Sequence, residues 1–239
     1  PKLDLRSGRI VGAEALVRSP ARELAAVGPA QIVALAEEAG MIHELGAFVL
    51  RSALTQARVW QTQGYAVLKM SVNLSPLQFR KGDLVRMVSS TLQDVELDAN
   101  CLELEITESA VMYNETQAIA VMNALSALGV SLAIDDFGVG YSSLGYLARF
   151  PIHCLKIDRS FIRDLPDDQE QAIVTRGIIS MAHGLELITV AEGVDSTAQM
   201  DFLRHHGCEQ AQGYAVSPPL QAEEFAQRFL GATARVAAL

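Results

Sequence analysis

Seven side chains suited to metal or phosphate chemistry each lie at or just past the end of a short apolar run in this sequence. They are Glu14, Asn73, Glu105, Asp135, Asp136, Lys156 and Glu192. Each apolar run is typical of a strand, and in a barrel of alternating strands and helices the carboxyl ends of the strands meet on one face. Because that face collects residues from distant parts of the chain, the sequence predicts one acidic pocket that carries out chemistry.

The donor types in this set favour a hard divalent cation. Six of the seven side chains offer oxygen, and no His or Cys occupies a matching position, which is the chemistry that Mg²⁺ and Mn²⁺ prefer. Adjacent aspartates on a continuing strand point to opposite faces, but a bend into the glycine-rich residues 137–141 would let both reach one site. Two ions about 3.5–4 Å apart would activate a water in phosphodiester cleavage. Lys156 would orient that water or neutralise charge that develops on phosphorus.

These residues also have simpler interpretations. A single Glu at a strand end is more often solvated or paired with a nearby basic residue, so the prediction depends on their joint occurrence. The glycines of residues 138–143 lack the full spacing of a phosphate-binding fingerprint. Lys156 also suits the Schiff-base chemistry of an aldolase-like barrel, although nearby carboxylates would raise its pKa and oppose that role. The five histidines show no ligand-like spacing and are expected at the surface or at helix ends.

Strand-like and helix-like segments alternate along the chain, a pattern typical of βα units around a parallel sheet. The expected strands span residues 10–17, 67–74, 101–107, 130–135, 153–157, 186–192 and 209–214. The expected helices, with apolar residues three and four positions apart, cover residues 30–63, 78–94, 114–128, 142–149, 168–183, 196–206 and 221–231. Gly129 and Gly184 lie where helices should end. The sequence therefore predicts the α/β class.

The first expected strand differs from the others. Residues 2–5 are joined to Ile10 by residues 6–9 alone, a connection too short for anything except an antiparallel hairpin. An antiparallel first strand is therefore predicted. This strand looks clipped at its amino end, so the chain is expected to be a fragment of a longer protein.

Length and composition narrow the class of protein. A chain of 239 residues suits one α/β barrel with a sizeable core, so residues 1–239 are expected to form one domain. The net charge is −9 and the basic residues are not clustered, which argues against a nucleic-acid polymer as partner. A small anionic substrate is compatible, because bound divalent cations reverse the local sign of charge. Short apolar runs and three widely separated cysteines favour a soluble cytoplasmic domain with buried thiols.

The motif around the first of these acids resembles that of a known family. Glu14-Ala15-Leu16, within G-A-E-A-L-V-R, is similar to the signature of the EAL-domain cyclic di-GMP phosphodiesterases. The motifs that resemble the family's, in its order, are S-V-N-L-S (71–75), L-E-L-E-I-T-E-S (102–109), D-D-F-G-V-G-Y-S-S-L (135–144), L-K-I-D-R-S-F-I (155–162), A-E-G-V (191–194) and Q-G-Y (212–214). The resemblance covers nearly the whole chain. It implies a modified TIM (β/α)8 barrel whose first strand is antiparallel, in agreement with the hairpin.

The resemblance also implies a reaction and roles for individual residues. The family hydrolyses cyclic di-GMP to linear pGpG with two Mg²⁺ or Mn²⁺ ions, and Ca²⁺ is inhibitory. The metal-binding positions are Glu14, Asn73, Glu105, Asp135, Asp136 and Glu192. Lys156 matches the lysine that contacts the nucleophilic water, and with Glu14 and Glu192 it forms the expected catalytic set. The positions near substrate or metal are Leu16, Arg18, Asp158 and Gln212. Glu108 matches the glutamate that supports the loop over residues 137–143.

Two departures from the family pattern affect the rim of the site. Ser19-Pro20 stands where the family usually has Trp followed by a His-Pro turn, and Val139 replaces the commoner threonine. The alternative function is a catalytically silent cyclic di-GMP receptor, a class that usually loses metal ligands, whereas all are present here. The resemblance further implies a homodimer and upstream sensory or GGDEF domains. A membrane anchor elsewhere in such a full-length protein is compatible with a cytoplasmic location of this domain.

Overall fold

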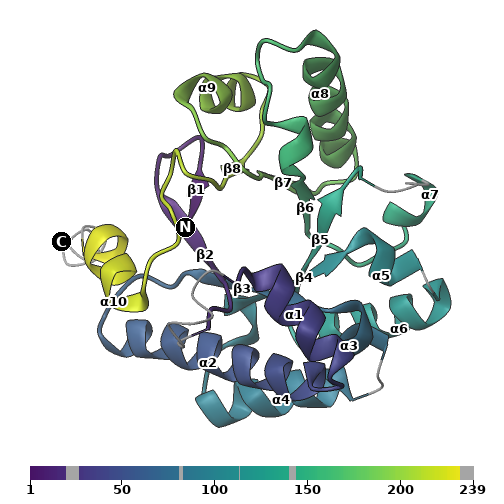
Figure 1. Ribbon diagram of the computed structural model, residues 1–239, viewed down its shortest axis with the longest axis vertical. Coiled ribbons are helices and arrows are strands. Elements are labelled where there is room, and N and C mark those ends of the chain that lie inside the picture. The colour runs from purple at the N-terminus through teal and green to yellow at the C-terminus, as the bar shows by residue number, and fades with distance from the viewer. Residues whose placement is uncertain (20–26, 81–82, 113, 140–143, 232–239) are drawn as a thin grey trace.

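The computed structural model describes residues 1–19, 27–80, 83–112, 114–139 and 144–231. Within these residues, eight strands close into a barrel in sequence order, and the helices surround it (Figure 1). The strands are β1 (Lys2–Asp4), β2 (Ile10–Ala15), β3 (Lys69–Leu74), β4 (Leu102–Thr107), β5 (Ser131–Phe137), β6 (Cys154–Ile157), β7 (Ile188–Ala191) and β8 (Gln210–Ala211). The predicted α/β class and the modified TIM barrel are confirmed.

The antiparallel first strand is also confirmed. β1 pairs antiparallel with both β2 and β8, whereas all the pairs from β2 to β8 are parallel. In the connecting turn, the amide of Asp4 donates to the carbonyl of Arg9 and the amide of Gly8 donates to the carbonyl of Asp4, both at 2.9 Å. Gly8 has φ = 69°, a conformation that glycine adopts without steric cost. The short connection thus forces the reversal, as the sequence predicted.

The helices follow the expected order, but the predicted helices over 30–63 and 78–94 are each divided in two, and the short helix over 108–112 was not predicted. They are α1 (Pro29–Glu38), α2 (Ile42–Thr62), α3 (Pro76–Arg80), α4 (Leu84–Val95), α5 (Glu108–Met112), α6 (Glu115–Ala127), α7 (Leu144–Leu147), α8 (Gln169–Gly184), α9 (Thr197–His205) and α10 (Ala222–Phe225). Short turns add η2 (Ala99–Cys101), η3 (Arg159–Phe161) and η4 (Ala226–Leu230). The prediction of one helix over 30–63 is wrong, because Gly40, at φ = 71°, follows the end of α1.

The two faces of the central strands differ in chemistry. Along β4, Leu102, Leu104 and Ile106 are fully buried in the main apolar core between strands and helices. Their neighbours Glu103 and Glu105 point the other way, because successive side chains on a strand alternate in direction. The barrel interior therefore receives buried acids, while the outer face of the same strand supplies apolar packing.

Outside the barrel, aromatic packing joins distant helices. The ring of Trp60 in α2 stacks on Phe225 in α10 with the centroids 5.1 Å apart. α2 also contacts α4 along one side of the barrel (Figure 1).

All three cysteines are buried and free, as expected. In the described part of the chain, the helices lack the combination of length and apolar character that crossing a membrane requires.

Gly213 provides a test of how tightly the segments after β7 and β8 fit. Its φ is 154°, and a Cβ added there would lie 2.3 Å from the backbone nitrogen and oxygen of Val194. Gly213→Ala should therefore lower the free energy of unfolding by about 2 kcal/mol or more, since a special backbone conformation and overpacking each cost about 1–3 kcal/mol. Urea unfolding curves would measure the loss.

Gly177→Ala is the matched control. Gly177 is exposed within α8, and apart from its chain neighbours and the surrounding helix backbone an added Cβ would meet no described atom within 4 Å. Because alanine favours a helix over glycine, this variant should gain about 0.5–1 kcal/mol. Equal losses in the two variants would contradict the close approach at Gly213.

Candidate active site

Lys156 lies at the centre of the predicted acidic pocket. It belongs to β6 and is 1% exposed. Its Nζ lies 2.5 Å from Oε2 of Glu105 and 2.6 Å from Oε1 of Glu192. The same nitrogen lies 2.9 Å from Oδ1 of Asp135 and 3.9 Å from Oε2 of Glu14. Four carboxylates carried by β2, β4, β5 and the end of β7 thus surround one ammonium.

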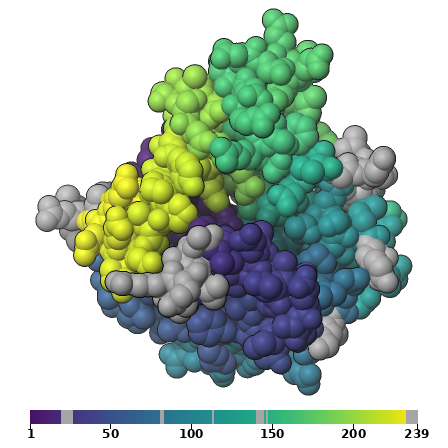
Figure 2. All heavy atoms as spheres, in the orientation of Figure 1, coloured from purple at the N-terminus to yellow at the C-terminus, as the bar shows by residue number. Residues whose placement is uncertain are grey.

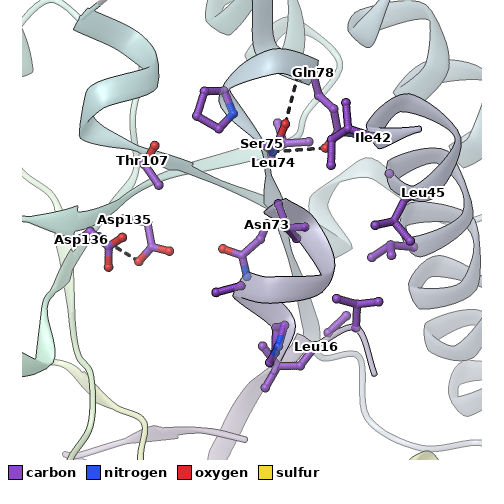
Figure 3. A pocket seen from close by; sticks show the side chains of 18 residues that line it. Leu16, Ile42, Leu45, Asn73, Leu74, Ser75, Gln78, Thr107, Asp135 and Asp136 are labelled. Atoms are coloured by element: carbon purple, nitrogen blue, oxygen red, sulfur yellow. Dashed lines mark hydrogen bonds between the residues drawn. The ribbon is translucent and has the colours of Figure 1, made fainter. Parts of the chain in front are cut away.

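Glu14 is held in this cluster from two sides. The side-chain amide of Asn73, on β3, donates to Oε1 of Glu14 at 2.6 Å. The amide of Gln212, just after β8, donates to Oε2. In Figure 3 the Asn73 side chain points to the side of the pocket where Asp135 and Asp136 lie. The predicted strand-end residues of β2 and β3 therefore come together with a residue from the far end of the chain.

A bend brings both adjacent aspartates to the same site. Asp136 has φ = 53°, a left-handed conformation that is uncommon outside glycine. Its amide donates to Oδ1 of Asp135 at 3.0 Å (Figure 3). Side-chain oxygens of Asp135, Asp136 and Glu192 all lie within 4.8 Å of one another. The expectation that a bend at the end of this strand lets both aspartates reach one site is confirmed.

The short turn η3 supports the two loops that carry these acids. A Cβ on Gly138 would lie 2.7 Å from the Phe161 ring, and a Cβ on Gly193 would lie 2.3 Å from Cγ of Arg159. Both glycines have positive φ, 95° and 63°. Arg159 also pairs with Asp195 at 2.8 Å. Arg159 and Phe161 lie in the motif L-K-I-D-R-S-F-I (155–162), but the sequence predicts no role for them, because contacts between loops leave no periodic signal.

The electrostatic environment of Lys156 favours its protonated form. Burial by itself would lower the pKa of Lys156, but the four surrounding carboxylates raise it well above its ordinary value. An aldolase-type lysine must lose its proton to attack a carbonyl carbon. The environment of Lys156 therefore disfavours the Schiff-base interpretation.

The pKa values of the acids in this cluster are shifted in opposite directions. Burial would raise the pKa of Glu105, but the ammonium groups of Lys156 and Lys2 more than offset this effect and lower the pKa. Burial raises the pKa of Glu192 to about 8, with Asp135 adding to the rise and Lys156 opposing it. Burial and the neighbouring Asp135 also raise the pKa of Asp136. The site thus concentrates more negative charge than its lysines balance, which favours the binding of further cations.

Beside the acids lies a pocket of about 350 Å³. Asn73, Asp135 and Asp136 form part of its wall, and apolar residues at and just after the end of β2, in α1 and in α2, including Leu16 and Ile42, form much of the rest (Figure 3). Figure 2 shows a hollow near the middle of the view, where the purple, green and yellow parts of the chain meet. With cations bound at the acids, such a pocket would suit a ligand with both an anionic and an apolar or flat part.

The other predicted residues have different surroundings. Arg18 is exposed, and its guanidinium donates to the carbonyl of Val17 at 2.9 Å. Asp158 accepts hydrogen bonds from the amide and hydroxyl of Ser160, so it caps η3. Glu108 is 5% exposed at the start of α5. Its predicted support of the loop over 137–143 involves residues 140–143, which lie outside the described residues.

Comparison with known proteins agrees with this geometry. The profile of the EAL domain family matches residues 1–219. The chain belongs to the EAL domain family. It is 44% identical over 220 residues to "Cyclic di-GMP phosphodiesterase NbdA" from Pseudomonas aeruginosa, covering 92% of this chain and 28% of that protein. It is 41% identical to "Bifunctional diguanylate cyclase/cyclic di-GMP phosphodiesterase MucR" from the same organism, covering 94% of this chain and 33% of that protein.

Solved structures of the family resemble this EAL domain closely. The PaMucR phosphodiesterase in complex with cyclic di-GMP aligns with a TM-score of 0.89 and 40% identity, covering 94% of this chain and 91% of that one. The EAL enzyme Bd1971, with cAMP and cyclic di-GMP bound, aligns with a TM-score of 0.89 and 31% identity, covering 95% and 62%. The chain spans only about a third or less of the length of NbdA and MucR.

The raised pKa of Glu192 predicts a pH dependence in the metal-free EAL domain. Between pH 4.5 and about 8 the folded state retains a proton on Glu192 that the unfolded state releases, so the contribution of Glu192 to stability falls as the pH rises through this window. Melting temperatures of metal-free wild type and Glu192→Gln, measured near pH 5 and near pH 8, test this. The wild type should lose more stability than the variant, whose amide does not ionise. Equal losses would contradict the raised pKa.

Proposed function

We propose that this EAL domain hydrolyses cyclic di-GMP to linear pGpG with the help of two Mg²⁺ or Mn²⁺ ions. The observation that supports this most directly is the convergence of Glu14, Glu105, Asp135 and Glu192 on Lys156. Asp136 joins the same cluster, so the acids of the predicted metal set lie together. The names of NbdA and MucR, and the cyclic di-GMP in the PaMucR complex, support the choice of substrate.

The donor set fits hard divalent cations. Carboxylate and amide oxygens are the ligands that Mg²⁺ and Mn²⁺ favour, and the ammonium groups of Lys156 and Lys2 do not neutralise all the acids gathered here. The residues that would hold the two ions are Glu14, Asn73, Glu105, Asp135, Asp136 and Glu192. Bound ions supply activation of the attacking water and stabilisation of charge on the phosphate. Ca²⁺, which is larger and tolerates looser coordination, is expected to inhibit.

The protein's own groups orient the reactants. Lys156 keeps its proton, so its ammonium contacts the attacking water as a cation and offsets charge that develops on phosphorus. Glu14 keeps a fixed orientation because Asn73 and Gln212 bind its two oxygens. Glu192 completes the proposed catalytic set on the other side of Lys156.

The pocket beside the acids accounts for the rest of the substrate. Leu16 contributes an apolar surface against which the nucleotide lies. Arg18 reaches a phosphate, and Asp158 and Gln212 complete the contacts near the metal and substrate. Glu108 supports the loop after Asp136 from the base of α5.

The proposal extends to the protein in which this domain functions. The domain works as a homodimer in the cytoplasm, behind upstream sensory or GGDEF modules. Two facts support a multidomain protein: the curated relatives are about three times as long as this chain, and the name of MucR describes both cyclase and phosphodiesterase activities.

Turnover of cyclic di-GMP is the decisive measurement. Wild-type protein with Mn²⁺ should convert cyclic di-GMP to pGpG, detected by chromatography. Glu14→Ala should lower turnover by more than about 100-fold, since even partners of metal ligands commonly contribute 10–100-fold. Glu224→Ala, at an exposed position of α10, is the control and should keep wild-type turnover. Tight binding without product in the wild type would instead indicate a silent receptor.

The identity of the ion is tested in the same assay. Mg²⁺ and Mn²⁺ should each restore turnover to chelator-treated protein, and Ca²⁺ added to the Mn²⁺-loaded enzyme should suppress it. Full activity in excess chelator, or equal support by Ca²⁺, would contradict the proposed metal chemistry.

A further inference from the structure

A second buried lysine reaches the predicted metal site from below. Lys2, on β1, is 2% exposed. Its Nζ lies 2.7 Å from Oε1 of Glu105, 2.7 Å from Oε1 of Glu103 and 2.6 Å from Oγ of Ser71. An ammonium has three N–H donors, and these three contacts use all of them. Lys2 was not among the residues that the sequence identified.

The two lysines divide the oxygens of Glu105 between them. Oε1 of Glu105 accepts from Lys2 in the barrel interior, whereas Oε2 accepts from Lys156 at the mouth. Hydrogen bonds between two charged partners are short and strong, so each oxygen has a fixed direction. Of the two oxygens, Oε2 is the one directed to the cluster of acids.

The surroundings of Lys2 keep its ammonium in place. Ser71 donates to Oε1 of Glu103 at 2.8 Å, so these two residues form one bonded group around the Lys2 nitrogen. Gly12 pairs with Lys2 across β1 and β2, and a Cβ there would lie 3.5 Å from Cδ of Lys2. The stem of Lys2 thus lies against a backbone without a side chain, and its ammonium has a fixed position in the barrel.

We propose that Lys2 is a positioning residue for Glu105. It commits Oε1 to the barrel interior, so that Glu105 presents only Oε2 to a metal ion and binds it through a single oxygen. This inference rests on the proposed metal-dependent function. Without Lys2, the Glu105 carboxylate could turn or chelate through both oxygens, and the metal would lose a ligand of defined direction.

A purely structural role for Lys2 has to be separated from positioning. Removing Lys2 alone leaves two buried acids with one fewer cation, which destabilises a fold whatever the site does. The double variant Lys2→Met and Glu103→Gln removes one charge of each sign. Its net charge equals that of the wild type, and the side-chain amide that replaces the Glu103 carboxylate can still bond Ser71.

The test is Mn²⁺ titration of metal-free protein by calorimetry, without nucleotide, together with melting temperatures. Glu103→Gln should bind Mn²⁺ within about threefold of the wild type. The double variant should melt near Glu103→Gln but bind Mn²⁺ about 10–100-fold more weakly, the usual effect of losing a partner of a metal ligand. Lys69→Met is a matched control, because Lys69 donates to the hydroxyl of Ser131 rather than to Glu105. This variant should keep wild-type affinity for Mn²⁺.

Wild-type affinity in a stable double variant would overturn the inference. A crystal structure of the wild type with Mn²⁺ provides a check that depends on no variant: Glu105 should contact the ion through Oε2 while Oε1 stays on Lys2. Contact through Oε1, or through both oxygens, would equally overturn it. A wild type that binds Mn²⁺ but cleaves no cyclic di-GMP would contradict the proposed hydrolysis. The comparison of Mn²⁺ affinities between wild type and variants would still test the role of Lys2.

Discussion

The rest of this structure depends on a balance of charge inside a closed barrel. Several strand residues of this interior, where apolar side chains are usual, are here acids and lysines joined through Glu105. Buried charges stay in a fold only when partners compensate them, so the acids and lysines require one another. The surplus of acid at the mouth of the barrel is what makes this face suited to cations and, through them, to phosphate.

Most of the architecture could be predicted because its causes are local. Alternating apolar runs and helical spacing predict βα units, and the short link between Leu5 and Ile10 permits only a hairpin. The site was also predictable in outline, since a barrel brings all strand ends to one face and only certain side chains at those ends suit metals. The break at Gly40 was missed because one glycine within an apolar pattern of helical spacing does not by itself end a helix.

What the sequence could not show is which distant side chains touch. Lys2 lies in the short segment Lys2-Leu3-Asp4, where a lysine is typical of a solvated position, and only barrel closure turns it inward. Arg159 and Phe161 support the loops at Gly193 and Gly138 through contacts that no periodicity encodes. The pKa of Glu192 likewise depends on burial and on neighbours from other strands. Such properties arise from the packing of the whole barrel.

The reversed direction of β1 has a mechanical consequence. In a barrel of uniformly parallel strands, the chain enters the first strand at the end remote from the reactive face. Here the chain enters β1 at the reactive end, and Lys2 is the first residue of that strand. A pull or twist applied to the start of β1 would be transmitted to Glu105 through one side chain and one hydrogen bond. The topology therefore places the first residue of β1 within direct reach of a carboxylate of the predicted metal site.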